Sequence, residues 1–212
     1  MKVIAINGSP KKEGNTYQAL TLVGNEIIKA GIDFEILHIG NKLIHGCTAC
    51  RKCAETKDKR CSGVPNDDLN NLNQQIYEAD GIILGSPVYY SGIAGTMKSF
   101  LDRLFYVSGA NGNMFRQKVG AAVVAVRRTG GSSTFDCLNH YLNITEMIIA
   151  TSNYWNVIHG REPGEVMQDA EGVQCMQVLG RNIAWLLKMK EATKDTIEPP
   201  LKTTKVVTHF VR

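Results

Sequence analysis

Long apolar runs are missing from this sequence. Nowhere in the 212 residues is there an uninterrupted apolar run of the roughly 18–20 residues that a membrane helix needs. The opening segment, MKVIAINGSP, has an apolar stretch that is too short for the hydrophobic part of a secretory signal. We therefore expect a cytoplasmic protein with no membrane partner, in a compartment where thiols stay reduced.

Strong charge of either sign is also missing. The formal net charge is +4, and no basic stripe is interleaved with aromatic residues, which is the pattern typical of nucleic-acid binding. We therefore expect no nucleic-acid partner. The mild positive charge favours small anionic molecules or an acidic partner.

Motifs of several common enzyme classes are absent. Neither G-x-x-x-x-G-K-[ST] nor G-x-G-x-x-G occurs, which argues against the usual triphosphate and dinucleotide loops. No conventional acid–base or nucleophile constellation is evident, and there are no internal repeats. Redox chemistry carried by a bound cofactor needs no such constellation.

The chain does contain short apolar runs that alternate with amphipathic segments. The apolar runs predict strands, and apolar residues three or four positions apart predict helices. The predicted strands are residues 2–7, 34–39, 81–84, 119–126 and 154–158. The predicted helices are about 15–30, one from 67, one through 97–105, about 134–149 and about 170–189.

Continuous apolar strands between helices are typical of a parallel sheet that is covered on both faces. We therefore predict an α/β fold: a flavodoxin-like, doubly wound, five-stranded parallel sheet in the order 2-1-3-4-5. The predicted domain spans residues 1–189, with a cysteine-rich insertion at 40–66, and residues 190–212 form a tail. Residues 205–212 have strand character, so the tail either frays or clasps another subunit as an oligomerisation arm.

The first loop, Asn7–Thr16 (NGSPKKEGNT), lies between a predicted strand and a predicted helix. Main-chain N–H groups at a helix N-terminus favour an anion, and Ser9, Asn15 and Thr16 add side-chain donors. The pattern suits a terminal phosphate better than a triphosphate with magnesium. An ordinary strand-to-helix turn is the alternative.

Two further loops are predicted at the same carboxyl edge of the sheet, where ligands bind in open parallel sheets. The segment 86–92 (SPVYYSG) offers aromatic faces, and the segment 127–132 (RRTGGS) has two glycines that let the backbone approach a planar ligand. A phosphate cradle, aromatic walls and a backbone-rich floor together fit flavin mononucleotide (FMN).

These segments are similar to the flavin-binding segments of two related families. NGSPKKEGNT, GSPVYYSGIAGTMKSFLDRLF and RRTGG resemble those of the NADPH-dependent FMN reductases and of the iron–sulfur flavoproteins, and SNYWNVIHG resembles their fifth strand. The resemblance covers roughly the first 190 residues. It implies that Ser9, Asn15 and Thr16 bind the FMN phosphate. It further implies that the remaining flavin-binding residues are Pro87, Val88, Tyr89 and Tyr90 beside the ring and ribityl chain, and Thr129, Gly130 and Gly131 on its far side.

Four of the six cysteines lie close together, in HGCTACRKCAETKDKRCSG. The C-x2-C-x2-C run of Cys47, Cys50 and Cys53 is too compact for the usual zinc arrangement of two separated pairs. It resembles runs that hold a [4Fe–4S] cluster, as the iron–sulfur flavoproteins do at this point. Cys61 is the expected fourth ligand, although its seven-residue gap is long for the family. A zinc site and a loop without metal remain alternatives. Cys137 and Cys175 are predicted to be core residues.

The expected function is that of an FMN-dependent oxidoreductase of the iron–sulfur flavoprotein type, which passes electrons between a [4Fe–4S] cluster and FMN. The alternatives are a metal-free NAD(P)H-dependent FMN or quinone reductase, a non-catalytic carrier like flavodoxin, and a zinc-organised interaction module. NAD(P)H or ferredoxin is the expected electron donor, with a small-molecule acceptor. The cysteine loop follows the second strand, which lies across the first strand from the loops of the flavin ring, so we expect a neighbouring subunit to bring its own cluster to this flavin. The resemblance also implies a homodimer or homotetramer.

Overall fold

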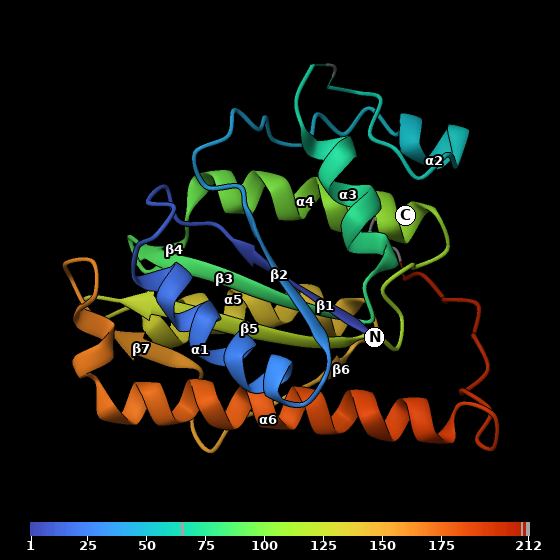
Figure 1. Ribbon diagram of the computed structural model, residues 1–212. Coiled ribbons are helices and arrows are strands. Elements are labelled where there is room, and N and C mark those ends of the chain that lie inside the picture. Colours follow the sequence, from blue (N-terminus) through green and yellow to red (C-terminus); the bar gives the residue numbers. More distant parts are fainter. Residues whose placement is uncertain (65, 209, 211–212) are drawn as a thin grey trace.

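A sheet of seven strands forms the core of the fold in the computed structural model, which describes residues 1–64, 66–208 and 210 (Figure 1). Its main path is β2-β1-β3-β5-β6, with β7 beside β5 and β4 beside β3. All pairs are parallel except β3 with β4. The strands are β1 (Lys2–Asn7), β2 (Asp33–His38), β3 (Gly81–Tyr89), β4 (Gly92–Ile93), β5 (Val119–Val126), β6 (Ile148–Ile149) and β7 (Val157–His159).

Helices cover both faces of the sheet, so that the central strands are buried on both sides (Figure 1). One face packs on α1 (Asn15–Lys29) and α6 (Ala170–Thr193), and the other packs on α3 (Leu69–Glu78), α4 (Gly95–Ala110) and α5 (Gly131–Ile144). All eight residues of β5 are buried. This explains why β5 is a continuous run of valine, alanine and glycine, with no polar residue between them.

The α/β class and the helices on both faces are as predicted, but the count of five strands is wrong. The first four predicted strands are β1, β2, β3 and β5, and they lie in the order β2-β1-β3-β5. The edge position beyond β5 is divided between β6 and β7, which pair with opposite ends of β5. The remaining addition is β4: the chain reverses after Tyr89 and pairs antiparallel with the end of β3, where a loop was predicted.

The predicted helix over 134–149 is also wrong at both ends. Helix α5 begins at Gly131 and ends at Ile144. Glu146 has a left-handed backbone (φ 56°), which a helix cannot continue through. The apolar pair Ile148–Ile149 therefore turns back to form β6 beside β5 rather than a last helical turn.

Smaller differences lie in the cysteine stretch and the tail. The cysteine stretch, predicted as irregular, contains the short helix α2 (Lys52–Thr56). Helix α6, which follows the 3-10 turn η1 (Glu165–Gln168), extends to Thr193, beyond its predicted end. Residues 205–208 form no strand, and the rest of the predicted terminal strand, apart from Phe210, lies outside the described residues. Within the described ranges, no helix is both long and apolar enough to cross a membrane.

Candidate functional site

The loop after β1 is fixed by its own side chains. Asn7 Oδ1 accepts a hydrogen bond from the Ser9 N–H (3.0 Å), and Ser9 Oγ accepts one from the Lys11 N–H (3.2 Å). A ring nitrogen of His38, at the end of β2, lies 2.8 Å from the Ser9 carbonyl oxygen. The loop therefore delivers the chain to the N-terminus of α1 in one conformation, and the first-turn N–H groups of a helix have no partner inside the helix.

A cavity of about 200 Å³ opens at this helix N-terminus. Ser9, Asn15 and Thr16, predicted to bind the phosphate, all line it. Thr16 is 1% exposed, and its Oγ1 is buried without a hydrogen-bond partner among the described residues. A buried hydroxyl without a partner is costly. A ligand oxygen in this cavity would satisfy the hydroxyl, so these residues fit a phosphate group.

The end of β3 forms the second wall of the same cavity. Pro87, Val88 and Tyr89 line it, as predicted for the flavin side. Tyr90 does not: it is fully exposed at the tip of the β3–β4 hairpin and lines neither this cavity nor the next one. Tyr90 and Ser91 have positive φ values of 49° and 58°, which non-glycine residues rarely adopt and which often mark functional loops.

The third predicted loop lines a neighbouring cavity. Thr129, Gly130 and Gly131 border a space of about 420 Å³, together with the aromatic residues Tyr154 and Trp155. Gly130 has a φ of 86°, and a Cβ there would lie 2.7 Å from Ser91 Oγ. The loop after β5 therefore packs directly on the β3–β4 hairpin. The structure thus divides the predicted flavin residues between two adjoining cavities.

One wall of the first cavity was missed by the sequence prediction. The segment after β7 contributes Gly160, Arg161 and Pro163. It is tied to α1 by Asn15, whose Oδ1 accepts a hydrogen bond from the Gly164 N–H (3.0 Å). The available signal was topological, because this segment follows the last predicted strand and so emerges at the same edge of the sheet.

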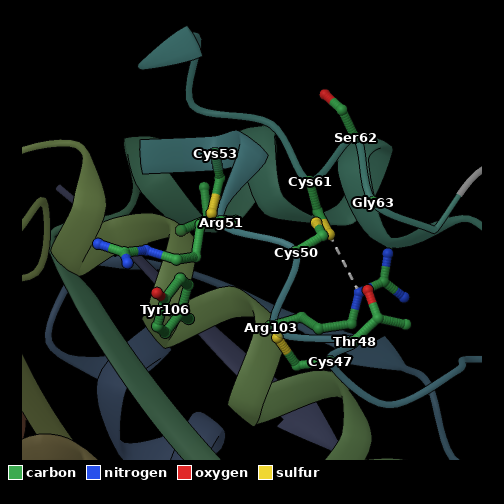
Figure 2. Close-up of a pocket in the computed structure, with 11 residues that line it drawn as sticks. Cys47, Thr48, Cys50, Arg51, Cys53, Cys61, Ser62, Gly63, Arg103 and Tyr106 are labelled. Carbon is green, nitrogen blue, oxygen red and sulfur yellow. Dashed lines mark hydrogen bonds between the residues drawn. The ribbon is translucent and has the colours of Figure 1, made fainter. Parts of the chain in front are cut away.

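The four clustered cysteines come together around one pocket on the α4 side of the fold (Figure 2). Cys47 and Cys50 are exposed, Cys53 is buried and Cys61 is half-buried. Gly63 packs against Cys50 so closely that a Cβ would lie 2.2 Å from Cys50 Sγ. Of the other two cysteines, Cys175 is buried in α6 as predicted, but Cys137 is exposed on α5, so its prediction as a core residue is wrong.

Hydrogen-bond donors surround these thiols. The Ala49 N–H donates to Cys47 Sγ (3.4 Å). The Lys52 N–H, together with the Thr48 hydroxyl, holds the pKa of the exposed Cys50 thiol below its ordinary value. Burial, reinforced by the neighbouring thiols, raises the pKa of Cys53. Ala49 and Arg51 have left-handed backbone conformations, with φ values of 53° and 63°, whereas Cys50 between them does not. Successive residues of alternating left- and right-handed conformation direct their N–H groups toward one point.

The largest fully buried side chain among the described residues also reaches this pocket. Arg103 of α4 is 0% exposed. Its Nε donates to Cys61 Sγ (3.3 Å), and its guanidinium pairs with Asp67 and donates to the carbonyl oxygen of His45 (3.1 Å). Figure 2 shows Arg103 below Cys50 and Cys61, with its bond to Cys61 as a dashed line. The sequence signal was an arginine within a run of core positions, in SFLDRLF.

The spacing of the thiols bears on which metal group they fit. Four sulfurs around one zinc ion lie roughly 3.8 Å apart, given Zn–S bonds of about 2.3 Å. Among the described residues, no three His, Cys, Asp or Glu side chains converge closely enough to hold a single ion. All four thiols nevertheless line one pocket, and four thiolates are the donor set of a [4Fe–4S] cluster as well as of a zinc site.

Comparison with known proteins decides the family. The family model for NADPH-dependent FMN reductase matches residues 1–162. This chain belongs to that family. The predicted family and the predicted flavin oxidoreductase activity are thereby confirmed, and membership supports FMN as cofactor.

Two curated relatives match this FMN reductase family member over nearly all of their length. An iron–sulfur flavoprotein of Methanocaldococcus jannaschii is 34% identical over 196 residues, which cover 89% of this chain and 98% of the relative. An iron–sulfur flavoprotein of Methanosarcina thermophila is 27% identical over 203 residues, covering 92% and 100%. The names of these two relatives indicate an iron–sulfur group in those proteins.

Solved structures show the same fold at low sequence identity. RosB, with a bound riboflavin-phosphate derivative, superposes with a TM-score of 0.71 at 14% identity and covers 100% of this chain and 94% of its own. An NAD(P)H:quinone oxidoreductase from Methanothermobacter marburgensis gives a TM-score of 0.64 at 15% identity, covering 86% and 96%. At these identities the likeness concerns the fold alone.

Proposed function

We propose that this FMN reductase family member is an oxidoreductase of the iron–sulfur flavoprotein type, with FMN in the cavity at α1 and a [4Fe–4S] cluster held by Cys47, Cys50, Cys53 and Cys61. The observation that carries the proposal is the gathering of these four thiols around one pocket that is lined by hydrogen-bond donors. When bound, FMN exchanges a hydride or single electrons, and a cluster exchanges single electrons.

The flavin residues act by binding and orientation. Ser9 and Thr16 and the N-terminus of α1 would hold the phosphate. The Oδ1 atom of Asn15 accepts a hydrogen bond from the Gly164 N–H, which leaves the side-chain NH2 group of Asn15 as a donor for the phosphate. Pro87, Val88 and Tyr89 would flank the ring, and Thr129, Gly130 and Gly131 would bound it where the two cavities adjoin. Tyr90, at the hairpin tip, would contact a ligand only from outside the cavity.

The test is the cofactor content of protein purified without oxygen. We expect about four irons and four sulfides, together with one FMN, per chain. Replacing Cys47 or Cys61 with serine is expected to remove most of the iron, whereas Cys137→Ser, which changes an exposed thiol on α5, leaves it unchanged. FMN without iron would indicate a metal-free NAD(P)H-dependent reductase, and zinc in place of iron would indicate a zinc-organised loop.

The surface around the cysteine pocket favours an acidic electron-transfer partner. Residues 51–60 contain five basic and two acidic residues. The basic five, Arg51, Lys52, Lys57, Lys59 and Arg60, are all exposed, and among the described residues none forms an ion pair. We propose ferredoxin as a donor at this surface, while the family name favours NADPH as a second donor to the flavin.

We expect reversal of this charge to slow electron transfer from ferredoxin. Changing Lys57, Lys59 and Arg60 to glutamate is expected to lower the reduction rate by roughly 10-fold or more at low salt, with a weaker salt dependence, because steering by complementary charge is lost. The matched control reverses Arg181 and Lys188 on α6 and Lys194 directly after it, because α6 covers the opposite face of the sheet. Equal salt-dependent rates in wild type and the first variant would contradict a ferredoxin site here.

A further inference from the structure

Cys61 is held at its main chain by one side chain of a different element. The amide of Asn70, near the start of α3, accepts a hydrogen bond from the Cys61 N–H at Oδ1 (2.7 Å) and donates from Nδ2 to the Cys61 carbonyl oxygen (3.1 Å). Both polar atoms of the amide are thus used on a single residue, nine positions earlier in the chain. A paired contact of this kind fixes the orientation of the peptide as well as its position.

The sulfur of the same residue is held from a second helix. Arg103 Nε donates to Cys61 Sγ (3.3 Å), and the guanidinium is anchored in turn by Asp67 and by the His45 carbonyl oxygen. Cys61 is therefore fixed at its nitrogen, oxygen and sulfur atoms, by α3 and α4 together. Figure 2 shows its thiol directed toward Arg103 at the side of the pocket.

The other three cysteines are held less firmly by distant residues. Cys47 and Cys50 are exposed, and the donor to Cys47 Sγ is the N–H of Ala49, from the same loop. Cys53 has a remote contact from Asn111 Nδ2 to its carbonyl oxygen, but that bond is long (3.4 Å). Rigid support by residues outside the ligand loop is thus concentrated on Cys61.

Support for Cys61 offsets the flexibility that its long spacing from Cys53 introduces. The seven residues between Cys53 and Cys61 give the fourth thiol much more conformational freedom than the two-residue gaps give the first three. Ordering a free segment lowers affinity for whatever it binds, and a residue that fixes the segment beforehand removes that cost. Asn70 fixes Cys61 while the thiol still faces the pocket.

We infer that Asn70 is a positioning residue that presents Cys61 to the pocket as the fourth ligand. The inference rests on the proposed iron–sulfur function. Among the described residues, the side chain of Asn70 forms hydrogen bonds only with the peptide of Cys61, so it acts through that residue. A shorter spacing between Cys53 and Cys61 would restrict the position of the Cys61 thiol through the chain itself. Asn70 restricts it instead from α3.

The test compares Asn70→Ala with Asn71→Ala, which removes the same amide from the exposed neighbouring position. Each protein is purified without oxygen with FMN bound, and the rate at which the iron chelator bathophenanthroline disulfonate removes iron is measured. Loss of an interaction that orients a metal ligand typically weakens binding 10- to 100-fold. We therefore expect iron release from Asn70→Ala to be about 10-fold faster or more, and release from Asn71→Ala to match wild type.

A second variant separates positioning from general stability. Asn70→Asp keeps the acceptor for the Cys61 N–H and is expected to release iron at an intermediate rate, even where the alanine variant folds poorly. Iron release from Asn70→Ala equal to that from Asn71→Ala overturns the inference alone. Wild-type protein without iron overturns the proposed function as well.

Discussion

Replacing Arg103 with methionine is expected to destabilise the protein by about 3–5 kcal/mol, the usual cost of removing one partner of a buried ion pair. Arg103 is 0% exposed and Asp67 has only 5% of its side chain exposed, so the carboxylate would be left with little water. The guanidinium also holds carbonyl oxygens of His45 and Val64, on both sides of the cysteine loop. The measurement is urea unfolding without oxygen, together with iron content.

The control is Lys98→Met in the same helix, where the ion pair with Asp102 is about half exposed and should contribute at most about 1 kcal/mol. Arg103→Lys keeps the positive charge but loses the forked set of donors, so we expect an intermediate loss of stability. Adding Asp67→Asn to Arg103→Met should recover part of the loss, since no unpaired charge then remains. An Arg103→Met protein as stable as Lys98→Met would refute the structural role of this arginine.

The positions of the central strands were predictable, because a strand that is buried on both faces is a continuous apolar run in the sequence. Strands such as Val119–Val126 have no polar position at all, which only a sheet covered on both faces allows. The strands at the edge beyond β5 are too short to form such a run. There the chain forms two short strands, β6 and β7, of two and three residues, and their positions depend on turns such as the one at Glu146 that no apolar pattern encodes.

Local motifs likewise reveal the parts of a site that adjoin each other in the chain. The candidate phosphate loop and the cysteine run could be proposed from the sequence, because the residues of each are close together in the chain. The supports were not: Arg103 contacts Cys61 from 42 positions away, and Asn15 reaches Gly164 across 149. Such contacts depend on how helices pack, and a single arginine or asparagine in a helix gives no sign of its distant partner.

Gly40→Ala is expected to weaken FMN binding by about 10- to 100-fold, an effect that distant misplacement of a binding loop can have. Gly40 follows β2 and packs against the phosphate loop, so that a Cβ would lie 2.1 Å from the Ser9 carbonyl oxygen and 2.2 Å from its carbon. These are main-chain atoms, which cannot turn aside as the end of a side chain can. The Ser9–Lys11 segment would have to shift away from the N-terminus of α1. Fluorescence titration of FMN into cofactor-free protein measures the change.

Gly109→Ala is the matched control, because a Cβ at this position in α4 meets nothing within 4 Å, and alanine should strengthen the helix. Thr16→Val is a second variant that tests the same cavity, because Thr16 lines it directly. The Thr16 hydroxyl has no hydrogen-bond partner among the described residues, so its removal should leave the fold intact and lower FMN affinity alone. If Gly40→Ala and Thr16→Val both bind FMN as tightly as Gly109→Ala does, the cavity at α1 is not the phosphate site. The flavin would then have to lie wholly in the neighbouring cavity beside Thr129 and Trp155.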